Sequence, residues 1–121
     1  MYVWGYNAYG QLGLGDFTNR LKPTLDSFFK NKKIKKLTCG YYHTLALFGK
    51  WFFIWFIFLE NGEIYSWGYN RFGQLGHGDS EKRNTPTLIS FFKGMNVMNV
   101  FAFNEQSFVL LGMYCIYLIH F

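Results

Sequence analysis

The chain has 121 residues, of which 50% are hydrophobic and 23% aromatic, so it can form one small domain with plentiful apolar surface. Its formal net charge of +5 is too small and too scattered to require a nucleic-acid partner. Two cysteines, Cys39 and Cys115, do not make a disulfide framework, and we favour a reducing compartment, the cytoplasm or the nucleus.

The chain opens with the predicted end of a strand at residues 1–4, followed by a glycine-rich loop at residues 10–15. Three glycines in six residues predict a tight loop that packs against a neighbour, with Leu12 pointing inward. Asp16 is expected to be a turn residue that bonds its own backbone. Pro23 then suits a turn or an edge strand, because proline donates no hydrogen bond to a ladder.

Apolar stretches predict two further strands, at residues 34–40 and 42–48, joined by a glycine turn. Corresponding strands are expected at residues 97–103 and 107–111. We count about four short strands in each half of the chain, with little room for helix. This pattern predicts an all-β fold of antiparallel, four-stranded units, as in a propeller blade or a similar radial repeat.

One thirteen-residue segment occurs twice, at residues 4–16 and, 63 positions later, at residues 67–79. Ten of the 13 paired positions are identical, and the register continues through an Arg-x-x-Pro-Thr element in both copies. Such a repeat indicates one supersecondary unit that is used more than once. We assign structural roles to Trp4, Gly5, Asn7, Gly10, Gln11, Leu12, Gly13, Gly15, Asp16, Pro23, Gly40, His43, Gly62, Trp67, Gly68, Asn70, Gly73, Gln74, Leu75, Gly76, Gly78, Asp79 and Pro86.

A hairpin turn is predicted at Asn61-Gly62, because this dipeptide is a strong signal for a tight turn before a strand. The first copy has no such lead-in, so we expect the chain to begin inside a repeat. The boundaries that follow are residues 1–48 for the first repeat and residues 60–111 for the second.

Two apolar segments, residues 49–59 and 112–121, begin at the same position of the repeat and do not fit it. Both are shorter than the roughly 20 residues that a membrane-spanning helix needs, so we do not favour a membrane protein. We interpret both as translated non-coding sequence at gene-structure boundaries. The protein would then run from Phe48 into the Glu60 region and continue past Leu111 with further repeats.

The motif Trp-Gly-x-Asn-x-x-Gly-Gln-Leu-Gly-x-Gly-Asp, followed by Arg-x-x-Pro and by residues 39–47, resembles the regulator of chromosome condensation repeat. The resemblance covers nearly the whole chain except the two apolar segments. It implies a seven-bladed β-propeller of four-stranded blades, with repeats of roughly fifty residues. Residues 102–107 of the second copy lack the glycine and the histidine that the first copy has at Gly40 and His43.

About two repeats form a partial propeller whose ring is not closed. Each blade buries its faces against its neighbours, so two blades leave two large apolar faces open. We therefore expect the isolated chain to be poorly soluble or marginally folded.

No residue pattern indicates catalysis, a cofactor or a metal. The glycine spacing matches neither a dinucleotide-binding motif nor a P-loop, and no helix pattern follows it. His43 lies four residues after Cys39 without a second pair of ligands, so we expect a buried histidine that is bonded to backbone and helps to hold blades together. Trp4 and Trp67 are expected to pack in the core, with each indole N–H seeking a carbonyl.

One basic cluster, residues 30–36, could contact the phosphates of nucleic acid or of a membrane surface. The equivalent stretch, residues 93–99, keeps one lysine, so a solvated loop is the favoured interpretation. Nucleic acid or chromatin is therefore a weak candidate partner.

The favoured function is a non-catalytic interaction platform that presents its rim loops to a protein partner. One alternative, implied by the resemblance, is part of a guanine-nucleotide exchange factor for a small Ran-like GTPase. Another is the targeting propeller of a larger enzyme, such as a ubiquitin ligase or a kinase. The fold does not decide among these functions.

Overall fold

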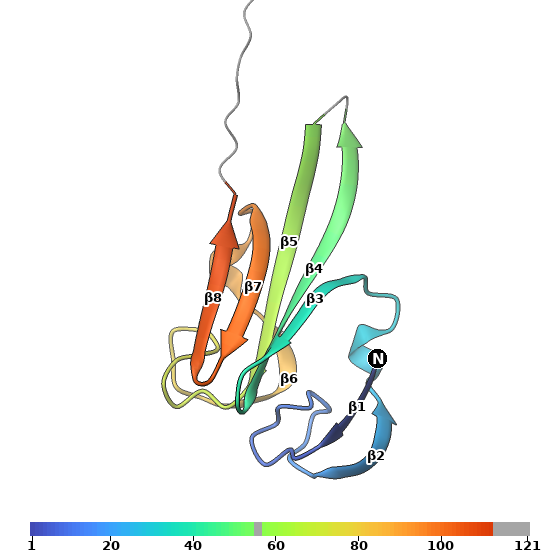
Figure 1. Cartoon of the computed structure of the whole chain (residues 1–121), viewed down its shortest axis with the longest axis vertical. Helices are drawn as coiled ribbons and strands as arrows, with labels where there is room; N and C mark the ends of the chain where they lie inside the picture. Colours follow the sequence, from blue (N-terminus) through green and yellow to red (C-terminus); the bar gives the residue numbers. More distant parts are fainter. Residues whose placement is uncertain (55–56, 113–121) are drawn as a thin grey trace, which may run out of the picture.

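The computed structural model describes the backbone of residues 1–54 and 57–112, and the side chains of residues 1–49 and 62–112. The predicted apolar tail therefore lies outside the described residues, apart from Gly112. Eight strands and two short three-ten helices follow one another (Figure 1): β1 (Tyr2–Gly5), β2 (Arg20–Leu25), η1 (Ser27–Phe29), β3 (Ile34–Cys39), β4 (His43–Ile54), β5 (Ile57–Gly68), β6 (Arg83–Leu88), η2 (Ser90–Phe92), β7 (Val97–Phe103) and β8 (Gln106–Leu111).

The strands form one four-stranded antiparallel sheet, β3-β4-β5-β6, and two antiparallel pairs, β1-β2 and β7-β8. We call β3–β6 the complete blade, β1–β2 the first half-blade and β7–β8 the second half-blade. The all-β fold class is confirmed, as an open, partial propeller. The complete blade takes two strands from each sequence copy, so blades and sequence repeats are offset by half a unit.

The complete blade is covered on both faces at residues 45–48 of β4, which explains why these four residues form a continuous apolar run. Side chains alternate along a strand, so Leu45 and Leu47 share one face while Ala46 and Phe48 share the other. The first face packs against the second half-blade in a cluster of Leu45, Leu47, Ile64, Ile89, Val97 and Val100. The second face packs against η1 in a cluster of Phe29, Ala46, Phe48 and Trp67.

The prediction of a turn at Asn61-Gly62 is wrong. Strands β4 and β5 pair continuously, with Gly49 opposite Gly62, Lys50 opposite Asn61, and further pairs out to Ile54 opposite Ile57. Residues 49–59 supply aromatic and β-branched residues that favour strand pairing, so the hairpin extends beyond the other strands (Figure 1). Gly62 instead allows close packing, because a Cβ there would lie 2.8 Å from a methyl group of Leu47.

The interpretation of residues 49–59 as translated non-coding sequence stays a prediction, and sequencing of the transcript tests it.

Both prolines lie where they were expected, because Pro23 is in β2 and Pro86 is in β6, and both strands are at sheet edges. Across the described residues, no helix combines the length and the apolar character needed to cross a membrane.

Candidate functional site: an aromatic rim

Buried asparagines hold both glycine loops in shape. The side-chain oxygen of Asn7 accepts a hydrogen bond from the Leu12 N–H at 2.9 Å, and its amide donates to the Asp16 carbonyl at 3.0 Å. Asp16 Oδ1 accepts from the Thr18 N–H at 2.9 Å, as expected for a turn residue. Leu12 is buried, as predicted. A buried amide whose groups are all bonded fixes the loop in one conformation.

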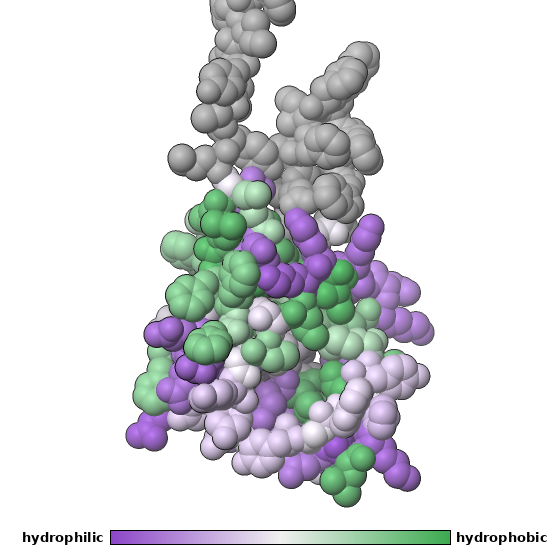
Figure 2. All heavy atoms as spheres, viewed as in Figure 1, coloured by the Kyte–Doolittle hydropathy of each residue, from purple (hydrophilic) through white to green (hydrophobic). Residues whose placement is uncertain are grey.

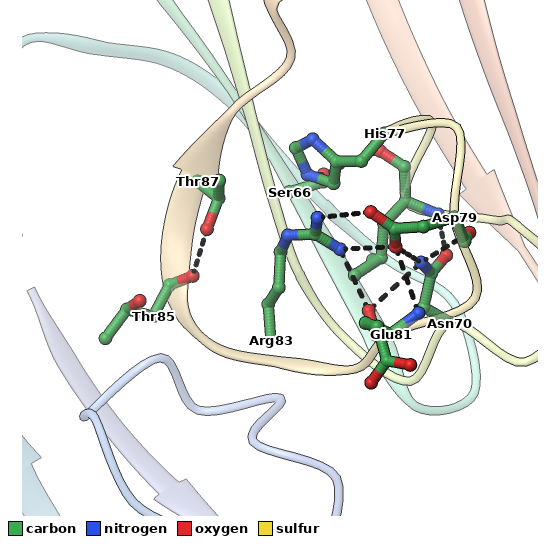
Figure 3. A network of polar contacts seen from close by, with 9 residues as sticks. Ser66, Asn70, His77, Asp79, Glu81, Arg83, Thr85 and Thr87 are labelled. Atoms are coloured by element: carbon green, nitrogen blue, oxygen red, sulfur yellow. Dashed lines mark hydrogen bonds and ion pairs between the residues drawn. The ribbon is translucent and has the colours of Figure 1, made fainter.

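The second loop repeats this network (Figure 3). Asn70 accepts from the Leu75 N–H at 2.9 Å and donates to the Asp79 carbonyl at 3.0 Å. The Arg83 guanidinium hydrogen-bonds Asp79 at 2.8 Å and holds the pKa of that carboxyl well below its usual range. His77 lies beside Ser66, with Nε2 2.9 Å from the hydroxyl. The two loops are therefore rigid copies of one structure.

One backbone carbonyl joins the first glycine loop to the complete blade by two hydrogen bonds. Gln11 O accepts from the Trp67 indole N–H at 2.8 Å and from the Thr44 hydroxyl at 3.1 Å. Trp67 is buried, so its prediction as a core residue with a carbonyl partner is confirmed. The same prediction is wrong for Trp4, which is largely exposed because no strand lies beyond β1 among the described residues.

His43 joins the complete blade to the second half-blade. It is buried, and its Nε2 lies 3.0 Å from the Ser107 hydroxyl on β8. A side chain of the neighbouring half-blade therefore bonds this ring, and the Gln106 backbone of the same half-blade contributes a second hydrogen bond, in line with the expected backbone partner. Burial lowers the pKa of His43. In the part of the chain that the structure describes, no group of three or more His, Cys, Asp or Glu residues is placed to hold a metal ion.

Members of the basic cluster contact neighbours within the fold. Lys32 lies 3.2 Å above the centre of the Phe28 ring. Lys36 donates to Asn99 Oδ1 at 2.7 Å and lies 3.8 Å from the centre of the Phe101 ring. These contacts favour a role in packing over a shared phosphate site.

An aromatic cluster, which we call the aromatic rim, joins the two glycine loops across the β3–β4 turn. Its rings belong to Tyr6, Tyr9, Tyr41, Tyr42, Tyr69 and Phe72. Tyr9 is at the centre, with ring centroids 5.0 Å from Tyr42 and 4.8 Å from Tyr69. The loops and the turn lie together at the lower end of Figure 1, and Figure 2 shows that end as a pale, weakly polar band.

The rim combines exposure with rigidity. Tyr6, Tyr41, Tyr42 and Phe72 are exposed, while Tyr9 and Tyr69 are half-buried beneath them. The Tyr69 N–H also donates to the Tyr42 carbonyl at 2.7 Å, which ties the second loop to the turn. A preformed set of exposed aromatic rings offers large contact area at a low entropic cost of binding.

The sequence interpretation missed the rim, although a signal was present. Tyr6 and Tyr69 occupy one repeat position, and Tyr9 and Phe72 occupy another. Adjacent blades bring equivalent loop positions side by side, so aromatic residues that recur in the loops predict a cluster.

Comparisons with known proteins identify the repeat. The family model described as "Regulator of chromosome condensation (RCC1) repeat" matches residues 1–47 and 61–110. The human X-linked retinitis pigmentosa GTPase regulator is 42% identical over 92 residues, covering 76% of this chain and 8% of that protein. The Arabidopsis thaliana ultraviolet-B receptor UVR8 is 36% identical over 86 residues, covering 71% of this chain and 17% of the receptor.

A further relative is the probable E3 ubiquitin-protein ligase HERC4 of Rattus norvegicus, 35% identical over 102 residues, which are 83% of this chain and 8% of the ligase. Among solved structures, human WBSCR16 superposes with a TM-score of 0.68 at 24% identity, over 92% of this chain and 26% of that one. The chain thus spans 8% to 17% of the length of these curated relatives. With a family model that matches both of its copies, the chain belongs to the regulator of chromosome condensation repeat family.

Proposed function

We propose that this chain is a non-catalytic propeller segment that binds a protein partner through the aromatic rim. The observation that carries the proposal is the row of contacting rings, four of them exposed, on the β3–β4 turn and on two loops that buried asparagines hold rigid. Tyrosine and other aromatic residues dominate the energetics of protein interfaces. Loops on a rigid scaffold are also where binding sites are usually found.

A small GTPase is the alternative partner class, since one relative is named as a GTPase regulator. In that case the rim would contact the GTPase and loosen its nucleotide without covalent chemistry. A role as the targeting part of a larger enzyme is the other alternative, because another relative is named as a ubiquitin ligase. The rim is the proposed contact surface in every case, and partner identity distinguishes them.

The test replaces two exposed ends of the rim, in the double variant Tyr41→Ala/Phe72→Ala. Both side chains are exposed, so the fold should be retained. Immobilised wild type and variant are incubated with lysate of the source organism, and captured proteins are quantified by mass spectrometry. We expect a partner whose capture, and whose affinity when purified, falls about tenfold or more in the double variant.

The matched control is Phe17→Ser, which removes an exposed ring outside the rim and inserts the residue that the second copy carries as Ser80. Capture by this control should equal capture by wild type. A panel of purified small GTPases carrying a fluorescent nucleotide tests the exchange alternative by the rate of nucleotide release. Captured proteins that bind the double variant as well as wild type would exclude the rim as the binding surface.

A further inference from the structure

Strands β4 and β5 project beyond the strands beside them (Figure 1). The ladder of β3 on β4 ends at Phe48, and the ladder of β6 on β5 ends at Tyr65. The pairing of β4 with β5 continues past both positions, to Ile54 opposite Ile57. Over residues 49–62, the two strands therefore pair with each other and with no other described strand.

The outer part of this hairpin is apolar along both strands. Residues 51–54 and 57–59, which we call the apolar tip, consist of Trp, Phe, Ile and Leu alone. A strand of consecutive apolar residues has no polar side to turn to water, and an isolated two-stranded hairpin is marginally stable in water. Removing the apolar tip from water is therefore strongly favourable.

Lysine side chains lie around the base of the hairpin. A Cβ on Gly49 would lie 3.5 Å from Lys35 Cδ, so Lys35 runs alongside the first projecting residue of β4. On the β5 side, Lys93 lines one groove together with Gly62. Figure 2 shows hydrophilic side chains gathered at this level, over the loop that leads into β3. The hairpin therefore leaves the fold through a basic surface.

Most of the net charge of the chain is at this end. Residues 26–36, 50–63 and 89–93, which we call the hairpin end, contain seven lysines and three acidic residues, whereas the rest of the chain contains five basic and four acidic residues. The hairpin end therefore carries +4 of the formal net charge of +5. Its lysines are Lys30, Lys32, Lys33, Lys35, Lys36, Lys50 and Lys93, and its acidic residues are Asp26, Glu60 and Glu63.

We propose that this chain docks on the surface of a lipid bilayer that is rich in anionic headgroups, with the apolar tip inserted at the headgroup boundary and the lysines of the hairpin end beside the headgroups. Aromatic residues are enriched at the boundary between lipid and water, and lysines near that surface are attracted to anionic lipids. Protein interfaces, by contrast, are depleted in lysine. The combination at the hairpin end therefore favours a lipid surface over a protein partner. This docking is a property of the chain that contains residues 49–59, whatever the origin of that segment.

The dimensions of the hairpin fit shallow insertion. At about 3.3 Å per residue, residues 51–54 reach about 13 Å, which matches docking of an apolar segment about 5–10 Å into the headgroup boundary. The same length is too short for the roughly 30 Å of a bilayer core. At shallow depth, the backbone groups on the outer edges of β4 and β5 stay within reach of water, so the hairpin needs no closed sheet.

The charge of a lysine acts on a lipid surface even where its side chain packs within the fold. Lys32 and Lys36 lie against aromatic rings, but attraction to an anionic surface acts through the electric field and requires no shared phosphate site. The aromatic rim is at the opposite end of β4, beyond His43. Docking through the hairpin would therefore leave the rim free for a protein partner.

Flotation of the full chain with lipid vesicles tests the proposal. We expect binding to vesicles of phosphatidylcholine with about one-third phosphatidylserine to be about tenfold or more tighter than to vesicles of phosphatidylcholine alone, and to weaken with added salt. Phe53→Ser/Phe58→Ser replaces two opposed residues of the apolar tip and should weaken binding about tenfold or more. Lys30→Gln/Lys33→Gln removes two exposed charges and should weaken binding to the anionic vesicles about tenfold.

Two matched controls separate this docking from general adhesion. Lys22→Gln/Arg71→Gln removes the same charge from exposed positions outside the hairpin end, and Trp4→Ser/Phe108→Ser removes two exposed rings outside it. Both should bind the anionic vesicles as wild type does. The double variant of the aromatic rim should also bind them unchanged, so failure of the lipid proposal can be told from failure of the proposed function.

Wild type that binds neither kind of vesicle, or equal binding by wild type and Phe53→Ser/Phe58→Ser, would overturn the proposal. So would binding that does not depend on anionic lipid. Sedimentation velocity without lipid tests the competing occupant. Chains that fail to bind vesicles, and form assemblies that Phe53→Ser/Phe58→Ser abolishes, would show that a second copy covers the apolar tip. Circular dichroism should show that both hairpin-end variants retain the β fold, because the residues that they change lie outside the core clusters of the complete blade.

Discussion

Trp67 and Trp4 are the same residue of the same motif, yet one is the centre of a core cluster and the other faces solvent. Trp67 has Phe29, Ala46 and Phe48 around it and Gln11 O to bond, because a loop of the preceding unit lies against its blade. The described residues place no such unit against Trp4. Burial in a repeat protein is therefore set by the neighbouring unit, not by the motif alone.

The largest predicted difference in the free energy of unfolding is between the alanine variants of the two tryptophans. Trp67→Ala should lower the free energy of unfolding by about 3–5 kcal/mol, because it leaves a cavity in a packed cluster. Trp4→Ala should change it by about 0.5 kcal/mol or less, because the Trp4 side chain is largely exposed. Urea unfolding at low protein concentration measures both values. Similar losses would mean that Trp4 is buried in the isolated chain.

A smaller difference is expected between two glycines of the loops. Gly10 has φ +79° and Gly73 has φ +76°, so alanine is strained at both positions by about 1–2 kcal/mol. At Gly10 the new Cβ also meets Asn84, which should cost about 1–3 kcal/mol more. Urea unfolding of Gly10→Ala and Gly73→Ala gives the difference. Equal destabilisation would show that the first loop does not pack against β6 in solution.

The smallest effect concerns the two histidines that differ between the copies. Burial lowers the pKa of His43 and, together with the charge of Arg83, the pKa of His77. The unfolded chain therefore binds more protons than the folded chain as the pH falls through about 6.5. Stability is complete above that value and declines below it.

The matched variants His43→Gln and His77→Leu carry the residues found at the equivalent positions, Gln106 and Leu14. Each should reduce the loss of stability between pH 7.5 and pH 5.5, measured by urea unfolding at both values. Wild-type stability that does not fall over this interval would show that these histidines are solvated in the folded chain.

The strands and the family could be predicted because glycine, Trp and Pro recur at fixed spacing. The arrangement of strands into sheets could not, since a periodic sequence does not show which four consecutive strands pair. The prediction of a hairpin turn at Asn61-Gly62 was wrong for a related reason. Residues 49–54 pair with residues 57–62, so the strands continue past a local turn signal.

The interior of the first glycine loop could be predicted from its residues, since Leu12 is buried and Asp16 bonds nearby backbone as expected. The aromatic rim was not predicted, because its rings come from three separate segments that only the blade arrangement brings together. The prediction that Trp4 is buried was wrong because its burial depends on a neighbour outside its own repeat.

Hydrogen–deuterium exchange of the dilute chain tests most directly whether burial is set by the neighbouring unit. The amides of β1 and β8 should exchange rapidly, while the amides of β4 and β5 in the complete blade stay protected. Amides of β1 and β8 that are as well protected as those of β4 and β5 would contradict the account.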